Sequence, residues 1–596
     1  MQNMAFTLIT FIAFTVLVAV VASKLVTSDD QSTSKGYFLA GNGLSGLFIA
    51  GSMMLTNLSA ENLVGLSGQS YGFNMSGMAW EATASVATVV MAFVFLPLYL
   101  KKGYTTLPEF MEDRYGGLIR RTVSLLFMIG YLFVGIPVCL YAGAIGFNQI
   151  FDLSAIFGIS SSMSITIIIV LVGIIGAGYA VFGGLKAVAV SDTINGILLV
   201  VGGILVPIFG FIVLGGGSLV GGFQHILDNA PEKLNAIGSA TDPVPFGCIF
   251  TGMVLANLFY WGTNQVLIQR TLGAKNLKEG QKGVLLSGFL KMMVPLIMVI
   301  PGIIASQLIP GLEKNDYAYG ALVSKVLPWP LTGLFCAALF GAIISTYNSF
   351  LNSAATIFML DIYKPIINPK IKDADMVKKA KFVGTIFAIF AIVFSPMLQG
   401  MDGLYDFGRS FTGFYNIPII TLVLVGMFTK WGSKMGAPIA IAWHIFFYSG
   451  FKFWFKYIDT PITNAICKIN YMNIYAISFI VMLVILFVCS RIAPVQTSYD
   501  NSDSARNDNY DMTPWMHRKE VAVWLISFLV FMYIMLSPIG LATHDRNITF
   551  IGGVCAFMVI ETVALLAYAI TKHQKYLKSQ RETVSVGNTV SAVNKD

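Results

Sequence analysis

Polar residues interrupt an apolar stretch of the sequence between residues 46 and 65. Thr56 to Asn62 brings one carboxylate, two carboxamides and two hydroxyls into a segment that is long enough to cross a bilayer. No water reaches such groups at membrane depth, so they persist where they line a cavity or hold an ion or a solute. A second polar run, Ser345 to Ser349, lies in another long apolar segment. Both runs predict interrupted spanning helices, which are typical of the binding site of a secondary transporter.

Ionisable side chains inside apolar segments need a partner or an aqueous cavity. Such residues in this sequence are Glu61, Glu81, Asp192, Lys291, Asp406, Arg409 and Glu561. With Asn57, Asn257, Tyr260 and Trp261 they offer hydrogen-bond donors, acceptors and an aromatic face, which suits a sugar. The alternative is that individual members stabilise helix contacts, and for Glu561 this is as good an explanation as any function.

Sodium is a hard cation that prefers oxygen, and a broken helix can offer it free backbone carbonyls. The polar run would free carbonyls from Leu55 to Leu58, and Ser345 and Thr346 could add hydroxyls from a facing helix. Serine and threonine also bond back to their own helix. The hydroxyl pair alone is therefore weak support for an ion site.

The composition indicates a polytopic, all-helical membrane protein. The 596 residues are 56% hydrophobic and 11% charged, whereas soluble domains are about a quarter charged. No phosphate-binding loop, disulfide framework, metal cluster or paired nucleophile and base stands out, so an enzyme is not expected and sodium is the one ion predicted. The net charge of +8 is explained by basic loops on one side and does not imply nucleic acid.

Fifteen apolar runs of about twenty residues predict transmembrane helices. With an outside N-terminus, twenty-nine of the 38 basic residues lie inside, so we expect a cytoplasmic C-terminus in a bacterial inner membrane. The first run lacks the features of a cleaved signal. The predicted runs are 5–25, 46–70, 78–100, 122–149, 163–182, 187–214, 246–269, 283–308, 328–360, 377–398, 406–428, 435–455, 473–490, 520–541 and 547–570.

The sequence resembles the sodium:solute symporter family, and within it the sodium/sugar symporters. The resemblance covers nearly the whole chain to about residue 430. It is carried by Gly36–Gly41, Asn57–Glu61, Tyr179–Leu185, Asn257–Trp261, Asn264–Gln265, Gln269–Leu272, Asn352–Phe358 and Asp361–Lys364.

The resemblance implies an inverted five-plus-five helix repeat of the LeuT type over 46–428. An extra helix and loop would occupy 1–45, further helices 429–570, and a disordered cytoplasmic tail 571–596. The implied sodium ligands are the carbonyls of Leu55, Leu58 and Ala342 and the hydroxyls of Ser345 and Thr346, with Asp192 able to support a second sodium. The implied substrate contacts are Asn57, Asn62, Glu81, Asn257, Tyr260, Trp261 and Lys291. Tyr260 would also be the inner gate, and Leu66, Trp80 and Tyr405 the outer gate.

Three departures from the family pattern bear on the substrate and the ion. Asn62 and Arg409 stand where glutamines are usual, and Asn348 stands where two-sodium members carry a hydroxyl. The Arg409 guanidinium would suit a carboxylate or sulfate, so an anionic or substituted sugar is one interpretation. The other is that Arg409 pairs with Asp406, one helical turn earlier. One sodium per sugar is expected.

The predicted function is sodium-coupled symport of a sugar into the cell by alternating access. A solute sensor of transporter ancestry, a symporter of a non-sugar organic solute and a channel are the alternatives. A sensor usually carries a cytoplasmic output domain, and a channel a continuous polar pore. The sequence leaves the oligomeric state open.

Overall fold

The computed structural model describes residues 2–25, 34–151, 153–399, 404–493 and 510–593. These ranges are helical apart from their connections, and an isolated β-bridge joins Leu44 to Ala274. The predicted all-helical class is therefore confirmed. The side chains of the motif Tyr179–Leu185 and most of the connector 491–519 lie outside the described part.

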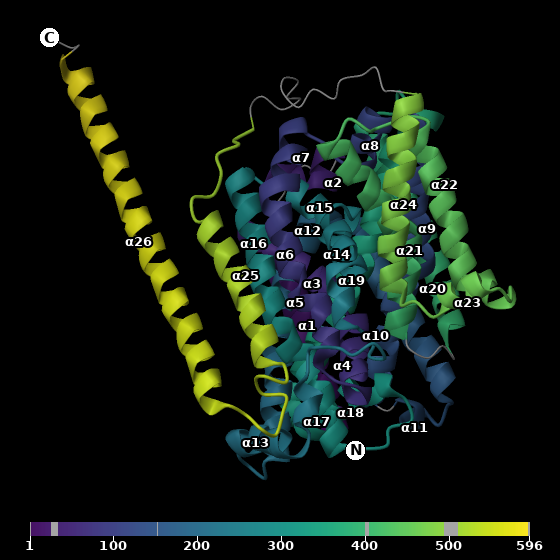
Figure 1. The fold of residues 1–596 in the computed structure, drawn as a ribbon, viewed down its shortest axis with the longest axis vertical. Helices are drawn as coiled ribbons and strands as arrows, with labels where there is room; N and C mark the ends of the chain where they lie inside the picture. The colour runs from purple at the N-terminus through teal and green to yellow at the C-terminus, as the bar shows by residue number, and fades with distance from the viewer. Residues whose placement is uncertain (1, 26–33, 152, 400–403, 494–509, 594–596) are drawn as a thin grey trace.

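The helices assemble into one bundle, and the long C-terminal helix α26 lies at its edge, where it contacts α25 and then projects beyond the bundle (Figure 1). Short 3-10 and π turns lie between several of them. In the first half of the chain the helices are α1 (Gln2–Leu25), α2 (Ser34–Leu39), α3 (Gly46–Asn57), α4 (Ala60–Gly72), α5 (Ala79–Ala82), α6 (Ala84–Val90), α7 (Leu96–Lys102), α8 (Leu107–Tyr115), α9 (Gly117–Gly130), α10 (Ile136–Phe151), α11 (Leu153–Phe157), α12 (Ser161–Leu214) and α13 (Leu219–Asn229). In the second half they are α14 (Gly252–Gly262), α15 (Gln265–Leu272), α16 (Leu277–Val294), α17 (Ile300–Leu308), α18 (Ala318–Val326), α19 (Trp329–Ile357), α20 (Asp373–Phe394), α21 (Leu404–Phe428), α22 (Gly436–Ser449), α23 (Pro461–Cys467), α24 (Tyr471–Ile492), α25 (Arg518–Met535) and α26 (Ile548–Val593).

Every apolar run predicted to span the membrane falls on helical structure. Among the described residues, ten helices are individually long and apolar enough to cross a bilayer. The other predicted spans are shorter, more charged or broken in the middle. The runs 163–182 and 187–214 belong to one helical segment, α12.

The first predicted interruption is confirmed at Leu58 and Ser59. Leu58 leaves the helical conformation with a ψ of 60°, and Ser59 is extended and begins α4 by accepting a hydrogen bond from the Asn62 backbone N–H. Serine is a favoured residue at such a helix start, because its hydroxyl satisfies a free N–H group. The polar residues therefore divide one apolar span into α3 and α4.

The second predicted interruption, at Ser345 to Ser349, is wrong. Here α19 is an unbroken helix, and the Ser349 hydroxyl donates to the Ser345 carbonyl at 2.6 Å, so polar side chains bond within the helix instead of breaking it. The second break lies between α14 and α15, at Thr263 and Asn264. Asn264 caps α15 by accepting from the Val266 N–H at 3.1 Å.

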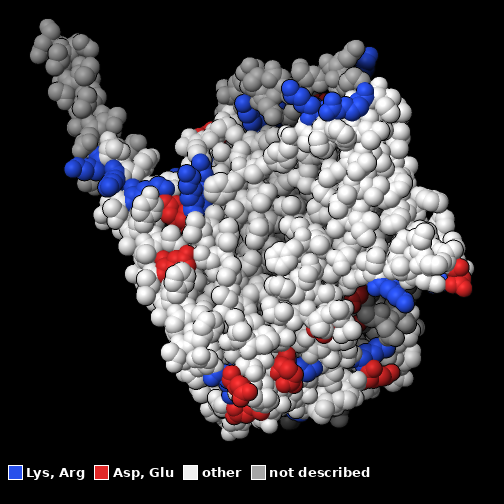
Figure 2. All heavy atoms as spheres, viewed as in Figure 1, with Lys and Arg blue, Asp and Glu red and all other residues white. Residues whose placement is uncertain are grey.

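Charged residues gather at the two ends of the bundle and leave a largely uncharged belt between them, on the face seen in Figure 2. Lysine and arginine are concentrated at the end where the C-terminus lies, and the N-terminus lies at the opposite end. This distribution is what a membrane-spanning bundle requires. It supports the expected orientation, which remains a prediction.

The last helix, α26, continues to Val593, beyond the point where the sequence predicts a disordered tail from residue 571. Lys572 anchors this stretch, because its ammonium group lies 2.6 Å from the Glu520 carboxylate of α25. The following residues, 573–582, include several strong helix formers, Gln, Lys, Leu, Arg and Glu. Helix propensity therefore outweighs the polar composition here.

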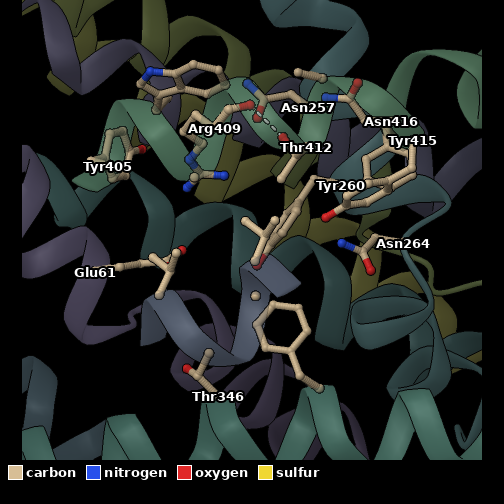
Figure 3. A pocket seen from close by; sticks show the side chains of 18 of the residues that line it. Glu61, Asn257, Tyr260, Asn264, Thr346, Tyr405, Arg409, Thr412, Tyr415 and Asn416 are labelled. Carbon is tan, nitrogen blue, oxygen red and sulfur yellow. Dashed lines mark hydrogen bonds between the residues drawn. The ribbon is translucent and has the colours of Figure 1, made fainter. Parts of the chain in front are cut away.

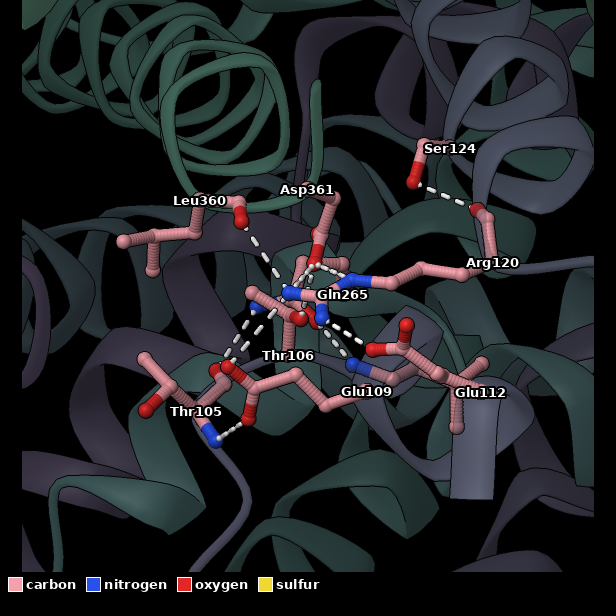
Figure 4. A network of polar contacts seen from close by, with 10 residues as sticks. Thr105, Thr106, Glu109, Glu112, Arg120, Ser124, Gln265, Leu360 and Asp361 are labelled. Atoms are coloured by element: carbon pink, nitrogen blue, oxygen red, sulfur yellow. Dashed lines mark hydrogen bonds and ion pairs between the residues drawn. The ribbon is translucent and has the colours of Figure 1, made fainter. Parts of the chain in front are cut away.

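A buried ion network joins four elements at the end of the bundle that holds α8 (Figure 4). The Arg120 Nε of α9 donates to the buried Asp361 carboxylate at 2.8 Å, and its terminal nitrogens reach Glu112 of α8 and the Leu360 carbonyl. Gln265, the first residue of α15, accepts from the Leu107 N–H at 2.9 Å. The network fixes the ends of α8, α9, α15 and the turn after α19 to one another.

Replacing Arg120 with methionine is expected to destabilise the bundle by about 3 kcal/mol, because it leaves the buried Asp361 carboxylate unpaired. Thermal unfolding of the detergent-purified protein would measure the loss. The double variant Arg120→Met, Asp361→Asn should recover part of it, and Arg121→Met, at the exposed neighbouring position, should unfold at the parental temperature. Equal loss in both single arginine variants would contradict the assignment.

Candidate functional site

The break in α3 faces the hydroxyl residues of α19. Thr346 Oγ1 donates to the Thr56 carbonyl at 3.2 Å, and the hydroxyls of Thr56 and Ser349 lie 3.1 Å apart. Ser345 Oγ is buried and has no hydrogen-bond partner. The two polar runs that the sequence singled out are thus brought together, although only one of them breaks its helix.

The predicted sodium ligands Leu55, Leu58, Ala342, Ser345 and Thr346 are all buried at this junction. Side chains already engage two nearby carbonyls, since Asn62 Nδ2 donates to the Asn57 carbonyl at 2.6 Å and Thr346 donates to that of Thr56. Such side-chain bonds show that α3 has left its regular backbone pattern here. Backbone and hydroxyl oxygens that converge at a broken helix are suitable ligands for a sodium ion.

Asp192, the predicted auxiliary acid, is held in a buried network with Arg270 of α15. Ser52 donates to Asp192 Oδ2 at 2.6 Å, and Arg270 Nη2 lies 3.7 Å from the same oxygen. Arg270 Nε donates to Ser52 at 2.7 Å, and its other nitrogens reach Ser349 and the Val266 carbonyl. The guanidinium therefore ties α3, α12, α15 and α19 together, and it neutralises the Asp192 carboxylate.

A cavity lies between the two helix breaks and α21 (Figure 3). Three of the predicted substrate residues, Asn257, Tyr260 and Arg409, line it, and so do the predicted gate residues Trp80 and Tyr405. Its other lining residues are Thr56, Glu61, Val134, Gly135, Val138, Ala256, Phe259, Asn264, Thr346, Phe350, Gly408, Thr412, Tyr415 and Asn416. It combines aromatic surface with hydroxyl, amide and charged groups, as a site for a polar ring-shaped solute requires.

Arg409 is surrounded by aromatic rings on the cavity wall. Its guanidinium carbon lies 5.2 Å from the ring centroid of Trp80, 5.9 Å from that of Tyr260 and 4.9 Å from that of Tyr405. Its Nη2 donates to Asn62 Oδ1 at 3.1 Å. Asp406 instead accepts from Gln69 Nε2 at 3.0 Å. Because the two side chains have different partners, the structure favours a cavity role for Arg409 over pairing with Asp406.

The remaining predicted substrate residues lie behind the cavity wall. Glu81 and Lys291 form a buried ion pair, and Asn62 Nδ2 lies 3.4 Å from Glu81 Oε1. The Lys291 ammonium lies 5.5 Å from the ring centroid of Trp261. Asn62 therefore connects this pair to Arg409. Asn57, Asn62, Glu81, Trp261 and Lys291 shape the wall and do not line the cavity in this conformation.

Tyr405 separates the central cavity from a second hollow at one end of the bundle. It lines both, and the second hollow is also lined by α4 and Phe73, by residues 313–316, and by Pro243 and Asp406. A methyl group on Gly65 of α4 would lie 2.4 Å from the Tyr405 Cβ. The predicted gate residue Leu66 is adjacent and fully buried. This close approach of α4 and α21 therefore closes the cavity on that side.

Several site residues have no individual role in the sequence-based prediction. Glu61 belongs there only to the set of polar and ionisable side chains that suits a sugar, and Asn264 and Arg270 belong only to motifs of the family resemblance. Each had a detectable signal, since Glu61 lies in the polar run, Asn264 is a capping residue between apolar helices, and Arg270 is a cation beside the break. Tyr415 and Asn416 lie within an ordinary apolar helix pattern, so their position in the cavity could not be inferred.

Comparison with known proteins matches this chain to a family and to many relatives, among them the following three. The family model "sodium:solute symporter family" matches residues 37–442. An uncharacterized symporter of Escherichia coli, YidK, is 40% identical over 534 residues, covering 89% of this chain and 91% of that protein. The sodium/glucose cotransporter of Vibrio parahaemolyticus is 31% identical, covering 75% and 85%. The human sodium/myo-inositol cotransporter 2 is 29% identical, covering 68% and 64%.

Among solved structures, a sodium-coupled sialic acid symporter in its outward-open state has a similar fold. The TM-score is 0.69 at 21% identity, over 83% of this chain and 99% of that one. At this level of identity the likeness concerns the arrangement of helices alone. It confirms the expected transporter fold.

Replacing Gly65 with alanine is expected to hold α4 away from Tyr405 and open the cavity toward the second hollow. The readout is labelling of a Thr412→Cys probe in intact cells by a membrane-impermeant maleimide, with the exposed Cys467 replaced by serine. We expect labelling at least threefold faster than in the same background with Gly65 intact. Gly552→Ala, where an added methyl meets no atom within 4 Å, should label at the parental rate. Unchanged labelling in Gly65→Ala would refute this closure.

Proposed function

Because the chain belongs to the sodium:solute symporter family, we propose that its solute is a sugar, taken up with sodium by alternating access. Membership makes it a multi-pass membrane transporter that couples sodium to a solute, and its bacterial relatives imply an inner membrane. What we propose beyond family membership is that the solute is a sugar. The relatives named for glucose and for myo-inositol support a ring that carries several hydroxyl groups.

The observation that carries the proposal is the composition of the cavity wall. Tyr260 offers an aromatic face, and Asn257, Thr412 and Asn416 offer amide and hydroxyl groups around the same space. Sugars are bound in this way, by directional hydrogen bonds to their hydroxyls and an aromatic ring against their apolar face. The cavity adjoins the oxygen-rich break where sodium would bind, so both solutes contact α3 and α19.

The proposed cycle follows from this shared contact. Sodium bound between the break at Leu58 and the hydroxyls of Ser345 and Thr346 holds α3 against α19, which shapes the sugar cavity. Binding of one solute then favours binding of the other. Closure at Tyr405 and opening at Tyr260 release both inside. For a neutral sugar the inward potential acting on the sodium ion would contribute about 2.3 kcal/mol per 100 mV, whereas for a monoanionic sugar the two charges cancel and the sodium concentration gradient drives uptake.

We propose further that the sugar carries an anionic group. Arg409 places a permanent cation at the cavity, and its Nε is buried without a hydrogen-bond partner. A guanidinium with an unused donor is suited to a carboxylate or a sulfate. Asp406 is not its partner, because the Asp406 carboxylate accepts from Gln69.

One sodium per cycle is the stoichiometry that we propose. The Asp192 carboxylate, which would support a second ion, is neutralised by Arg270. Arg270 also donates a hydrogen bond to the Ser349 hydroxyl, so this oxygen is already engaged. Asn348 adds no hydroxyl at this level of α19. A guanidinium at this position leaves little attraction for a second cation.

The main rival is a sensor that binds the solute without moving it, followed by a symporter of a non-sugar organic solute. Proteoliposome uptake of labelled hexoses, myo-inositol, hexuronates, sulfated hexoses, organic acids and amino acids, with and without a sodium gradient, separates them. We expect sodium-driven accumulation of a sugar with a Hill coefficient for sodium near one. Binding without accumulation would favour a sensor, and uptake of organic or amino acids alone would exclude the sugar.

The site assignments predict two separable defects in the same assay. Ser345→Ala removes a sodium ligand and should raise the sodium concentration for half-maximal uptake at least fivefold. Tyr260→Ala removes the aromatic face and should raise the KM for the sugar at least tenfold. Ser579→Ala, an exposed serine on α26, is the control and should match the parent. Parental kinetics in both site variants would refute the assignments.

Arg409→Gln tests the charge of the sugar. For a hexuronate or a sulfated hexose we expect at least a tenfold loss of affinity, a difference of about 1.4 kcal/mol, while affinity for the matching neutral hexose stays or improves. Uptake of a monoanion with one sodium moves no net charge, so an inside-negative potential should not accelerate it. Preference of the parent for neutral hexoses, with uptake accelerated by potential, would contradict an anionic substrate.

A further inference from the structure

Four ionised side chains surround the cavity, and two of them already neutralise each other. Glu81 and Lys291 form a buried pair behind the wall. Arg409 and Glu61 remain, and both line the cavity itself. The strongest charge interaction of Glu61 is with Arg409. The cavity therefore contains one cation and one anion of its own and is electrically balanced when empty.

Glu61 occupies the boundary between the cavity and the helix break. It is the second residue of α4 and follows Leu58 and Ser59, where α3 ends. Figure 3 shows its side chain between Arg409 on one side and Thr346 on the other. Thr56 and Thr346, which connect α3 to α19, line the same cavity. One carboxylate thus faces both the proposed anion-binding group and the proposed sodium site.

The start of α4 and the Arg409 guanidinium both stabilise a negative charge on Glu61 and offset part of the cost of burying it. Glu61 lies in the first turn of α4, where the free N–H groups and the helix dipole stabilise a negative charge. Its side chain is half-buried, so water screens its interactions only in part. A charge in such a place acts over several ångströms on any ion that enters the cavity or the break.

We infer that Glu61 is the electrostatic link between the two solutes, acting as the countercharge of Arg409 without sodium and of the sodium ion when it is bound. Sodium bound at the break neutralises the Glu61 carboxylate, so the Arg409 cation no longer has a countercharge. An anionic group of the sugar then restores neutrality. This inference rests on the proposed sodium site and anionic sugar, and it explains how the ion raises affinity for the substrate.

The same arrangement gives a reason for obligatory coupling. An anionic sugar that enters before sodium meets both Arg409 and the uncompensated Glu61, which repels it. Sodium that enters alone leaves the cavity with a net positive charge. Only the empty cavity and the doubly occupied cavity are neutral, and a neutral cavity is the form that closes at least cost in a membrane interior.

The test is equilibrium binding of radioactive sodium to the full-length purified protein, without any sugar, by a scintillation proximity assay. We expect Glu61→Gln to weaken sodium binding at least tenfold. Arg409→Gln should tighten it three- to tenfold, because it removes the competing cation. The double variant should bind sodium more tightly than Glu61→Gln alone, because the Arg409 cation repels sodium whether or not Glu61 is charged. Sodium affinity that is unchanged in Glu61→Gln, or unchanged in Arg409→Gln, would overturn the inference.

Conservative and matched variants distinguish a charge effect from misfolding. Glu61→Asp keeps the charge and should bind sodium within threefold of the parent. Glu561→Gln is the same substitution in α26, away from the cavity, and should leave sodium affinity unchanged. A loss in Glu61→Asp as large as in Glu61→Gln, or an equal loss in Glu561→Gln, would also overturn the inference.

Galacturonate competition completes the test in the same assay. In the parent, sodium should raise galacturonate affinity at least tenfold, and in Glu61→Gln the sodium-free affinity should approach that raised value. Sodium-free affinity in Glu61→Gln that stays at the parental level would count against the link. If no sugar binds to the parent, the anionic-sugar proposal fails, whereas the sodium measurements still decide the role of Glu61.

Discussion

The structure depends on the requirement that every charge inside the bilayer be neutralised by a neighbour. Asp192 is paired with Arg270, Glu81 with Lys291 and Asp361 with Arg120, and each pair joins different helices. Removing one member would strand the other in a medium that stabilises ions poorly. These pairs therefore specify which helices meet, and Glu61 and Arg409, which line the cavity outside these pairs, are available to solutes.

The two helix breaks expose backbone groups to the charged interior, where they could bind ions. Ser59 and Asn264 begin α4 and α15 with side-chain caps, so at each restart one of the free N–H groups is satisfied within the membrane. The backbone near the breaks then faces α19 and the cavity. The residues that form the breaks are small and polar. They therefore lower the hydropathy of the span locally, and they also supply oxygen atoms that could bind a cation.

The sequence predicted the class of fold well, because burial in a lipid core imposes a local rule. About twenty apolar residues are needed to span the core, so the helices could be counted without any contact information, and Leu58 and Ser59 could be identified as a break. The same reasoning failed at Ser345 to Ser349, where Ser349 bonds back to its own helix. Whether a polar run breaks a helix depends on which hydrogen-bond partners its side chains have, and hydropathy contains no information about those partners.

By itself the sequence determined the spans, the first break, the family and the residues that do not belong in a bilayer without a partner. Only the tertiary structure decided which of them are partners. Glu81 and Lys291 are 210 positions apart, and many other pairings of the acidic and basic residues would also give a neutral interior. It also decided that Arg409 faces the cavity and Asp406 does not, although one helical turn separates them. Distances between helices are set by close packing of whole surfaces, such as Gly65 against Tyr405, and that information is distributed over the entire chain.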